Sequence, residues 1–418
     1  MKGLRAHRQG ASLRSSCSVL FLVASAALVS INACASNEEL GSELPADGGA
    51  LEDSTTPAPD ADADAGADAG DGAIDGDAAP RTCTDQGFCH VPLPEPVTLR
   101  GVWGDGTGVV WAVAEQGNIL RWDGTAWAIH SSVKGALLTI WGSGPTDIWI
   151  GGEAGLLHGT GPSSSQLTFT ALPSDSDIPI TSVHGFGPND VWAVGGRATW
   201  DPETWEGREE SRVLHYTGPT GDPATEWRLD PISERVAVFS RVWGASADDV
   251  WLGGVTDLAE PYGGVVLRGK SDGAGGTSFT EFPVGTGYFD RIYRPTGGVV
   301  LEDAFVVGES SGRVGYVWIG PHDPSDGGGA EPRIFTGDDF ASGYLINAVW
   351  AASKNDAWIV GNGGRVWHWD GTSWSVGGVT LTKFPLTNDL HAMWGSPSGE
   401  LWIVGDGIAL RKSLGGGK

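Results

Sequence analysis

Hydrophobic and polar positions follow a short period along most of this chain. At residues 98–131, four segments, TLRGVWG, VVWAVA, NILRW and AWAIHS, are separated by stretches rich in glycine and acidic residues. The second segment alternates with period two, which is typical of a β-strand with one face buried. The Asp-Gly pair of DGT precedes the fourth segment, and glycine accepts the positive φ of a tight hairpin turn. The unit therefore predicts four antiparallel strands, named a to d in chain order.

The start of this unit recurs along the chain. Five copies carry two tryptophans eight residues apart, one at the end of strand a and one in strand b: Trp103/Trp111, Trp141/Trp149, Trp243/Trp251, Trp350/Trp358 and Trp394/Trp402. A sixth copy has His184 in the first slot and Trp192 in the second. A side chain that repeats once in each unit belongs to the packing between units. We therefore interpret the tryptophans as core residues and not as a ligand platform.

A seventh, more divergent copy is expected in the widest gap. Trp243 and Trp350 are 107 residues apart, about twice the usual interval. RIYRPTGGVVLEDAFVVGE fits there, with Tyr293 and Phe305 in the two slots and a longer loop between them. Units of four strands bury their apolar faces only by stacking on their neighbours. The sequence thus predicts an all-β chain that forms a seven-bladed β-propeller.

The two ends of the repeat region are predicted to close the ring. The last unit supplies only LHAMWG, LWIVG and IALRKS, so its strand d has to come from elsewhere. Phe88 precedes Trp103 by 15 residues, close to the 14-residue interval between Trp127 and Trp141. We therefore expect the segment around Phe88 to complete the seventh blade and remove an open sheet edge. Cys83 and Cys89 flank this segment and are candidates for a small disulfide loop.

Two polar positions also repeat with the blades. His158, His215 and His368 occupy the slot that Arg121, Arg268 and Arg411 fill in other copies of strand c. Because the same slot in different blades is about 10 Å apart, we predict hydrogen bonds between blades and no metal site. Four aspartates stand just before strand b and are predicted to form turns by bonding local backbone amides: Asp147, Asp190, Asp249 and Asp356. No cofactor motif is present, so neither a metal nor a cofactor is expected.

The N-terminus indicates export. Basic residues precede the apolar run SVLFLVASAALVSINA, which is typical of a signal peptide over residues 1–33. INAC resembles the lipobox of bacterial lipoproteins, with Ile31 in the apolar slot and Ala33 before the cleavage point. The resemblance implies that Cys34 is lipidated and anchors the protein to a membrane. Ala35, directly after the cysteine, resembles the sorting signal that directs lipoproteins to the outer membrane. The protein would then face the periplasm or the cell surface. Plain secretion after cleavage at another alanine is the alternative.

Residues 34–82 form a predicted acidic linker rich in Ala, Asp and Gly. Residues 38–77 hold thirteen carboxylates, half of the formal net charge of -26. A segment of this composition cannot form a core, so we expect it to be disordered and extended. Weak calcium binding by DADADAGADAGD is an open alternative, although Ala65 stands where a calcium loop needs glycine. The acidic total argues against nucleic acid as a partner.

The repeat region, 83–418, resembles the propeller repeats of exported bacterial lipoproteins. Its DGTAW and DGTSW turns are similar to the Asp-box of sialidase-like propellers, although shorter and without the leading serine. The resemblance implies a fold and not an activity. We interpret the chain as a monomeric, membrane-tethered, non-catalytic binding or scaffold module for a glycan or a protein. A sialidase-like enzyme that cleaves glycans and an envelope-assembly lipoprotein are the open alternatives.

The candidate site lies in two long b–c connections. RATWDPETWEGREESR (197–212) and VTDLAEPYGG (255–264) are much longer than the other b–c turns and belong to adjacent units. Their aromatic residues do not fit the repeat, so the core does not account for them. The candidate ligand-binding residues are Trp200, Trp205, Tyr262, Asp201, Glu203 and Asp257. The alternative is that the two insertions only cap each other.

Overall fold

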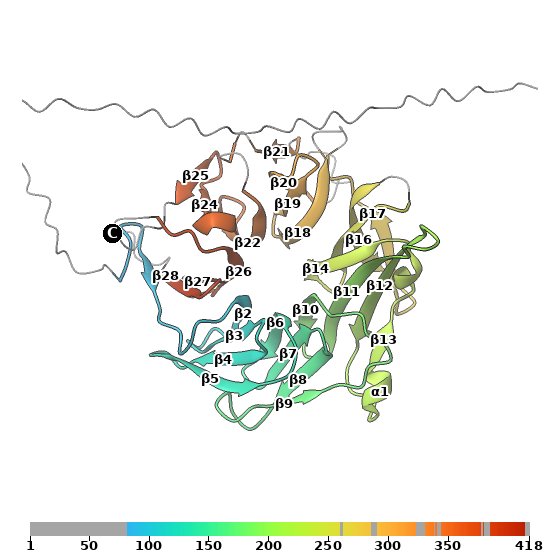
Figure 1. The fold of residues 1–418 in the computed structure, drawn as a ribbon, viewed down its shortest axis with the longest axis horizontal. Coiled ribbons are helices and arrows are strands. Elements are labelled where there is room, and N and C mark those ends of the chain that lie inside the picture. The colour runs from blue at the N-terminus through green and yellow to red at the C-terminus, as the bar shows by residue number, and fades with distance from the viewer. Residues whose placement is uncertain are drawn as a thin grey trace, which may run out of the picture. The chain divides into compact units, whose positions relative to one another are not determined.

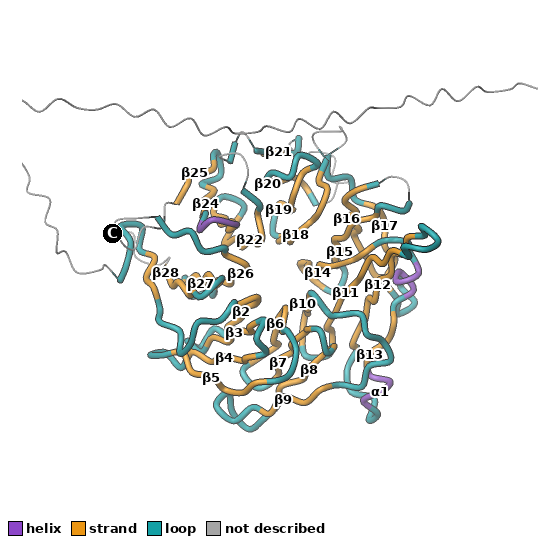
Figure 2. Tube along the Cα trace, in the orientation of Figure 1, coloured by secondary structure: helices purple, strands orange, loops and turns teal. Residues whose placement is uncertain are grey.

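Seven four-stranded antiparallel sheets form a ring (Figures 1 and 2). The innermost strands of blades 3 to 7 line a cavity, which we call the central channel. The computed structural model describes residues 82–259, 262–285, 291–322, 331–337, 339–340, 344–377, 379 and 385–413. The predicted signal peptide, Cys34 and the linker up to residue 81 lie outside the described residues. In the part that is described, each repeat forms one blade, so the predicted seven-bladed propeller is confirmed. No helix in that part is long and apolar enough to cross a membrane.

The strands of each blade run outward from the innermost strand a. The first three blades consist of β2 (Leu99–Gly104), β3 (Val110–Ala114), β4 (Asn118–Trp122) and β5 (Trp127–Ser132); β6 (Leu137–Gly144), β7 (Asp147–Gly152), β8 (Gly155–Thr160) and β9 (Thr168–Ala171); and β10 (Ser182–Gly187), β11 (Asp190–Trp200), β12 (Gly207–Tyr216) and β13 (Trp227–Leu229). Blades 4 and 5 consist of β14 (Val238–Ser246), β15 (Asp249–Thr256), β16 (Gly263–Ser271) and β17 (Thr277–Glu281); and β18 (Ile292–Val300), β19 (Asp303–Ser310), β20 (Gly315–Pro321) and β21 (Arg333–Phe335). Blades 6 and 7 consist of β22 (Ile346–Ser353), β23 (Asp356–Gly361), β24 (Val366–Trp369) and β25 (Trp374–Gly377); and β26 (Leu390–Gly395), β27 (Glu400–Gly405), β28 (Ile408–Ser413) and β1 (Phe88–His90). Among the described connections lie a short helix, α1 (Pro223–Glu226), and two 3₁₀ turns, Pro231–Glu234 and Asn362–Gly364.

The ring closes through β1, as the sequence predicts. β1 pairs antiparallel with β28, and Phe88 lies opposite Lys412. The Phe88 side chain is fully buried and meets the indole of Trp358 edge-on, with ring centroids 5.6 Å apart. A disulfide joins Cys83 to Cys89 beside this strand. The first described strand therefore completes the last blade, and the seventh sheet has no missing strand.

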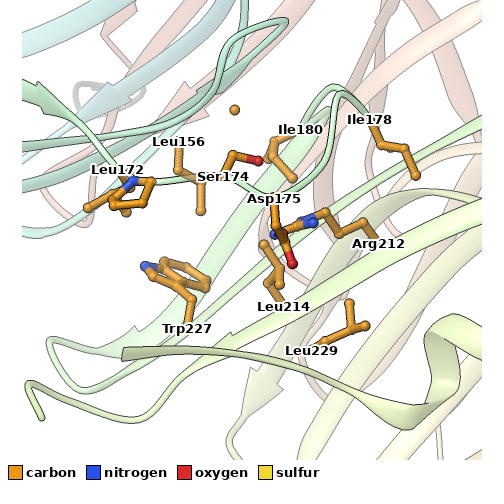
Figure 3. Close-up of a pocket in the computed structure, with 12 residues that line it drawn as sticks. Leu156, Leu172, Ser174, Asp175, Ile178, Ile180, Arg212, Leu214, Trp227 and Leu229 are labelled. Carbon is orange, nitrogen blue, oxygen red and sulfur yellow. The ribbon is translucent and has the colours of Figure 1, made fainter. Parts of the chain in front are cut away.

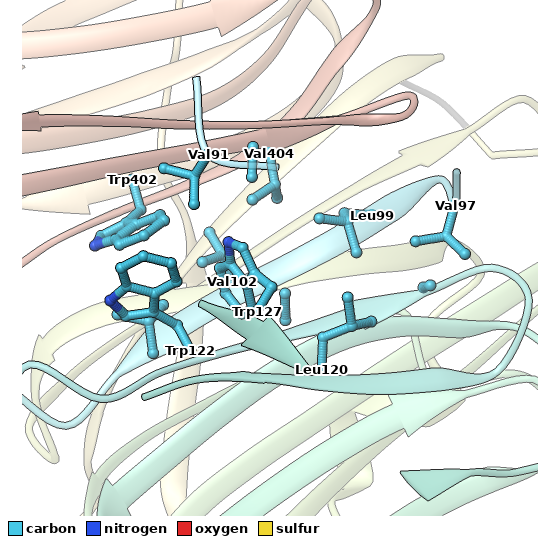
Figure 4. Packing of buried hydrophobic residues seen from close by; sticks show 13 residues of the cluster. Val91, Val97, Leu99, Val102, Leu120, Trp122, Trp127, Trp402 and Val404 are labelled. Atoms are coloured by element: carbon cyan, nitrogen blue, oxygen red, sulfur yellow. The ribbon is translucent and has the colours of Figure 1, made fainter. Parts of the chain in front are cut away.

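A cluster of tryptophans fills the junction between blades 7 and 1 (Figure 4). Trp402 of blade 7 lies 5.2 Å from Trp122 and 5.4 Å from Trp127 of blade 1, measured between ring centroids. Val91 and Val97, from the segment that connects β1 to β2, join the same cluster. Aromatic pairs in such tilted and edge-on arrangements add about 0.5–1.5 kcal/mol beyond their buried area. The closing segment thus holds the two end blades through its core contacts as well as through strand pairing.

Contacts between blades explain why glycine follows tryptophan in strand a. The indole of Trp103 in blade 1 lies over Gly142 of blade 2, where an added Cβ would come within 2.7 Å of the ring. The same contact recurs in the pairs Trp394/Gly104, Trp141/Gly185 and Trp350/Gly395. In blade 5, Trp243 lies against Gly298, which comes one residue before the position opposite Phe305 and not one residue after it. A real Cβ cannot approach a ring so closely, so only glycine accepts the neighbouring tryptophan. These tryptophans are blade-packing residues, as the repeat pattern predicts.

The divergent blade 5 differs from the expected alignment. Val299, and not Tyr293, lies opposite Phe305, in the position where other blades pair their two tryptophans. Strand β18 contains two register shifts, after Ile292 and after Pro295, which take up residues that we expected in the connecting loop. The placement of Tyr293 in the first slot was therefore wrong. Strands β18 and β19 are joined by a tight turn at Leu301 and Glu302.

The repeated histidines bond within their own blades, so the prediction of bonds between blades was wrong for them. It is confirmed for two arginines in the same slot: Arg121 donates to Ser164 of blade 2, and Arg268 donates to the His322 carbonyl of blade 5. His158 Nε2 lies 2.6 Å from Asp147 Oδ1, and both residues belong to blade 2. Blades 3 and 6 repeat the pair, with His215 and Asp190 at 2.9 Å and His368 and Asp356 at 2.8 Å. The reason is strand geometry: His158 lies opposite Trp149, and Asp147, two residues before Trp149, shares its face.

The aspartates before strand b also have a different role from the one predicted. Asp147, Asp190 and Asp356 accept from the histidine rings and do not serve mainly as turn formers for backbone amides. In blade 4, Asp249 Oδ1 accepts from Arg268 Nε at 2.5 Å and from the Trp251 indole at 3.0 Å. In blade 4, Arg268 thus takes the place of the histidine: it donates to the aspartate, and its guanidinium lies 5.7 Å from the centroid of the Trp251 ring.

Candidate functional site

The long connection in blade 3 is an extended β-hairpin. Strands β11 and β12 pair residue by residue from Val191 opposite Tyr216 to Trp200 opposite Gly207. The segment predicted as a loop is therefore mostly strand, with its turn at residues 201–206. Asp201 Oδ1 accepts from the backbone amides of Glu203 at 2.8 Å and Thr204 at 3.2 Å, which fixes that turn.

One face of the hairpin carries ion pairs. Arg197 donates from Nη1 to Asp177 at 2.8 Å and from Nε to Glu210 at 3.1 Å. Arg208 lies 3.5 Å from Glu210 on the same face. Since Asp177 belongs to the connection between blades 2 and 3, these contacts attach the hairpin to that connection.

The other face of the hairpin contacts the long b–c connection of blade 4. Glu209 accepts from Thr256 Oγ1 at 2.8 Å and from the backbone amide of Asp257 at 2.6 Å. A Cβ added at Gly207 would lie 2.9 Å from Leu258 Cδ2, so the Leu258 side chain packs directly on the Gly207 backbone. The two insertions therefore meet on one rim of the propeller.

The large side chains on this rim are exposed, although the insertions touch. Trp200 is 56% exposed, Trp205 75%, Tyr262 53% and Leu258 42%. These four make up half of the eight large hydrophobic residues that are exposed in the described part of the chain. Trp200 and Trp205 meet edge-on, with ring centroids 6.2 Å apart and planes at 83°. Contact between the bases of the loops does not bury these side chains. We call these four residues the aromatic rim.

The candidate carboxylates have different roles on the rim. Hydrogen bonds from the Glu203 and Thr204 amides hold the pKa of Asp201 below its ordinary value. Asp257 accepts from the Tyr293 hydroxyl at 3.2 Å, and burial together with that carboxylate raises the pKa of Tyr293. Asp201 and Asp257 are thus engaged within the chain and shape the loops. Glu203 is exposed beside them.

A pocket that the sequence interpretation did not find lies between blades 2 and 3 (Figure 3). Its volume is about 320 Å³, and Leu156, Leu172, Leu214 and Trp227 are among the residues that line it. Arg212 Nη2, on β12, lies 2.5 Å from Asp175 in the wall of the pocket. The feature of the sequence that could have indicated this pocket is Arg212, a charged residue next to the apolar Val213 and Leu214. Comparison of the repeats does not single out Arg212, because this residue belongs to the inserted hairpin.

The Asp-Gly-Thr turns are held by their aspartates. Asp123 Oδ1 accepts from the Thr125 amide at 2.8 Å and the Thr125 hydroxyl at 2.7 Å. These bonds lower the pKa of Asp123 from 3.8 to about 2. Asp370 makes the same contacts with Thr372, and its pKa is also lowered. The turns have a local structural role. The described residues hold no group of three or more His, Cys, Asp or Glu side chains that could bind a metal ion.

Comparison with known proteins shows the fold. No protein-family model matches the chain, and no curated protein matches it. Ycf48 from Cyanidioschyzon merolae is 14% identical with a TM-score of 0.56, over 78% of this chain and 99% of that one. A structure of Ycf48 bound to a D1 peptide is 14% identical with a TM-score of 0.54, over 80% and 99%. The WD40 repeats of RRP9 are 10% identical with a TM-score of 0.55, over 80% and 100%. The chain thus shares a β-propeller fold with Ycf48 and with WD40 proteins, and these likenesses show the fold alone.

Proposed function

We propose that this chain is a non-catalytic binding module that holds an apolar segment of a partner protein on the aromatic rim. The observation that carries the proposal is the exposure of Trp200 and Trp205 on a hairpin fixed from both sides by Arg197 and Glu209. Exposed aromatic side chains on a rigid support bind with little loss of conformational entropy and commonly dominate interfaces. Half of the exposed large hydrophobic residues in the described part gather here, which is typical of an interaction surface.

Two features favour a protein over a glycan. The rings of Trp200 and Trp205 stand edge-on and do not form one flat platform for a sugar ring. Leu258 beside them offers an aliphatic surface that suits an apolar side chain. Exposed Glu203 and Glu206 border the rings, so basic residues in the partner segment complement them. One solved structure of a protein with this fold is bound to a peptide.

The anchor forms part of the same proposal. Cys34 in INAC carries the lipid, and residues 35–82 act as an extended tether between the membrane and the propeller. We place the monomeric protein at the cell envelope, on the outer membrane. Labelled fatty acid should be incorporated into the wild type, and Cys34→Ser should move the protein into the soluble exported fraction. Absence of label from the wild type contradicts the anchor and leaves the binding proposal intact.

Binding is tested with the full chain and a library of random peptides. Selected peptides should contain an apolar core flanked by lysine or arginine. The triple variant Trp200→Ala/Trp205→Ala/Tyr262→Ala should bind them at least about tenfold more weakly, a loss of about 1.4 kcal/mol or more. Val376→Ala, which truncates a side chain 51% exposed in blade 6, is the matched control and should bind normally. Binding of polysaccharides and of no peptide would favour the glycan alternative.

A further inference from the structure

Side chains of the innermost strands bridge the gaps between blades around the channel. Thr181 Oγ1 donates to the Ser240 carbonyl at 2.9 Å, from blade 3 to blade 4. Thr296 Oγ1 donates to the Ile346 carbonyl at 2.7 Å, from blade 5 to blade 6. Asn347 Nδ2 donates to the Leu390 carbonyl at 2.8 Å, from blade 6 to blade 7. Neutral side chains therefore suffice to join neighbouring blades at the channel.

The gap between blades 4 and 5 is bridged by an arginine instead. Arg241 donates from Nε to the Thr296 carbonyl at 2.7 Å and from Nη1 to the Ser240 carbonyl at 2.8 Å. Carbonyl groups satisfy donors but do not cancel a positive charge. Arg241 forms no ion pair with any carboxylate in the described part of the chain. The positive charge of the Arg241 guanidinium therefore has no counter-charge among the described residues.

Two other arginines with little exposed surface each pair with a carboxylate. Arg268 pairs with Asp249, and both side chains are only 10% exposed. Arg212, 16% exposed, pairs with Asp175 at 2.5 Å. A cation removed from water costs several kcal/mol unless an anion compensates it. Arg241 differs from these two arginines, because its described partners are carbonyl groups.

Arg241 borders the cavity of the central channel. The cavity has a volume of about 260 Å³, and its lining includes Arg241, His184, Gly298, Val349 and Met393. Desolvation by the surrounding protein, followed by repulsion from the Arg100 guanidinium, holds the pKa of Arg241 below its ordinary value. Burial lowers the pKa of His184 to about 4, so this histidine is neutral at pH 7. The cavity thus combines a cation that has no ion pair among the described residues with a lining of polar and apolar groups, and no described carboxylate lines it.

Arg100 approaches the channel from blade 1 but is already paired. Its Nη2 lies 2.5 Å from Glu115 Oε1, and its Nη1 lies 3.3 Å from His391 Nδ1. Because a guanidinium only donates, His391 Nδ1 accepts, and its Nε2 donates to Asp406 Oδ1 at 2.9 Å. Blade 1 and blade 4 are separated by two blades on one side of the ring and three on the other. The two guanidiniums therefore approach the channel from opposite sides, and of the two only that of Arg241 lacks an anionic partner among the described residues.

We infer that the central channel binds an oxyanion, a carboxylate or a phosphate, through Arg241. Nε holds the bridge to Thr296 of blade 5, Nη1 donates to Ser240 of its own strand β14, and Nη2 has no hydrogen-bond partner among the described residues. The free edge of the guanidinium suits a bidentate oxyanion. Val349 and Met393 give the ligand a small apolar wall. This site is separate from the aromatic rim and does not depend on the proposed protein partner.

The test measures the stability of the full chain in acetate, in inorganic phosphate and in sodium chloride at equal ionic strength. A ligand that binds only the folded state raises the melting temperature saturably. We expect such a rise with acetate or with phosphate, and none with chloride. Acetate alone identifies the ligand as a carboxylate, and phosphate alone identifies it as a phosphate. An equal response to all three salts overturns the inference.

Substitutions test whether the anion that raises the melting temperature binds at Arg241 in the channel. Arg241→Gln should weaken binding of the active anion at least about tenfold. Arg208→Gln, which removes an arginine 75% exposed on the blade 3 hairpin, should leave that binding unchanged. If Arg241→Gln does not fold, Met393→Glu supplies the alternative, because its carboxylate enters the same cavity and pairs with Arg241. Met393→Glu should lose anion binding while its melting temperature is maintained or raised. Binding as tight as that of the wild type in either folded variant would overturn the inference. The aromatic-rim variants should bind the anion normally, so the two proposals can fail separately.

Discussion

The imidazole of His158 lies flat on the indole of Trp149, with ring centroids 3.6 Å apart and ring planes at 6°. Its Nε2 meets Asp147 Oδ1 at 2.6 Å. Blades 3 and 6 repeat the arrangement, with ring centroids at 3.9 Å and 4.2 Å. Each blade that carries this histidine thus has its own stack and hydrogen bond, and the arrangement stabilises the blade from within.

His158→Ala is expected to lower the free energy of unfolding by about 2 kcal/mol, because it removes both the ring stack and the hydrogen bond. Urea denaturation measures the loss. Thr170→Ala, which truncates an exposed side chain opposite His158, is the control. Because the histidines act within separate blades, His158→Ala and His368→Ala should be additive within about 0.5 kcal/mol. A coupling well above that value would contradict the local account.

Asp249→Ala is expected to lower the free energy of unfolding by about 3–5 kcal/mol, more than His158→Ala does. It leaves the Arg268 charge buried without its carboxylate partner and the Trp251 indole without its acceptor. Asp356→Ala is the matched comparison, since its carboxylate is 41% exposed and its partner is a histidine. Chemical denaturation of the two variants gives the difference. Equal losses would show that burial of the pair does not govern its contribution.

Phe88→Ala is expected to lower the free energy of unfolding by about 3–5 kcal/mol, because it empties a fully buried site in the strand that closes the ring. Deletion of residues 83–98 should lower the melting temperature further, since it also removes β1 and the Cys83–Cys89 disulfide. Val376→Ala serves as the control for a truncated exposed side chain. An unchanged melting curve for the deletion contradicts the role of β1 in closure.

Acid should weaken the Asp-Gly-Thr turn of blade 1. Hydrogen bonds from Thr125 and Ala126 lower the pKa of Asp123 from 3.8 to about 2, so the ionised carboxylate stabilises the folded state. Its contribution is complete above about pH 5 and is lost as the pH falls through the folded pKa. The difference in unfolding free energy between the wild type and Asp123→Ala should be constant from about pH 7 to 5 and shrink between about pH 4 and 2. A difference that grows on acidification would contradict this sign.

The fold could be predicted from the sequence because its signal is repeated. The spacing from Trp103 to Trp111, and its copies, fixes strands a and b in blade after blade, and the missing last strand points to Phe88. The hairpin of blade 3 could be located because its length and its tryptophans depart from the repeat. Its strand pairing could not, because a segment rich in Glu and Arg lacks the apolar alternation of a buried strand.

Contacts that depend on register escaped prediction. The partner of His158 follows from which residue lies opposite Trp149, and spacing along the chain does not specify that. Blade 5 was misaligned because its register shifts leave no regular period around Tyr293. Arg241 follows a register shift in β14, so the alternation of the strand does not indicate that it borders the channel. That Arg241 borders the channel without a described ion-pair partner follows only from the arrangement of the innermost strands in space.

Site-specific photocrosslinking tests the central claim, that the aromatic rim holds a partner protein, most directly. A photoreactive phenylalanine analogue replaces Trp205 in one form of the full chain and Val376 in another, and each form is exported by cells of the source organism. The account predicts one discrete crosslinked protein from position 205 and none from position 376, with the crosslink suppressed by a selected peptide. Equal crosslinking at both positions, or crosslinking at position 205 to glycan alone, would contradict it.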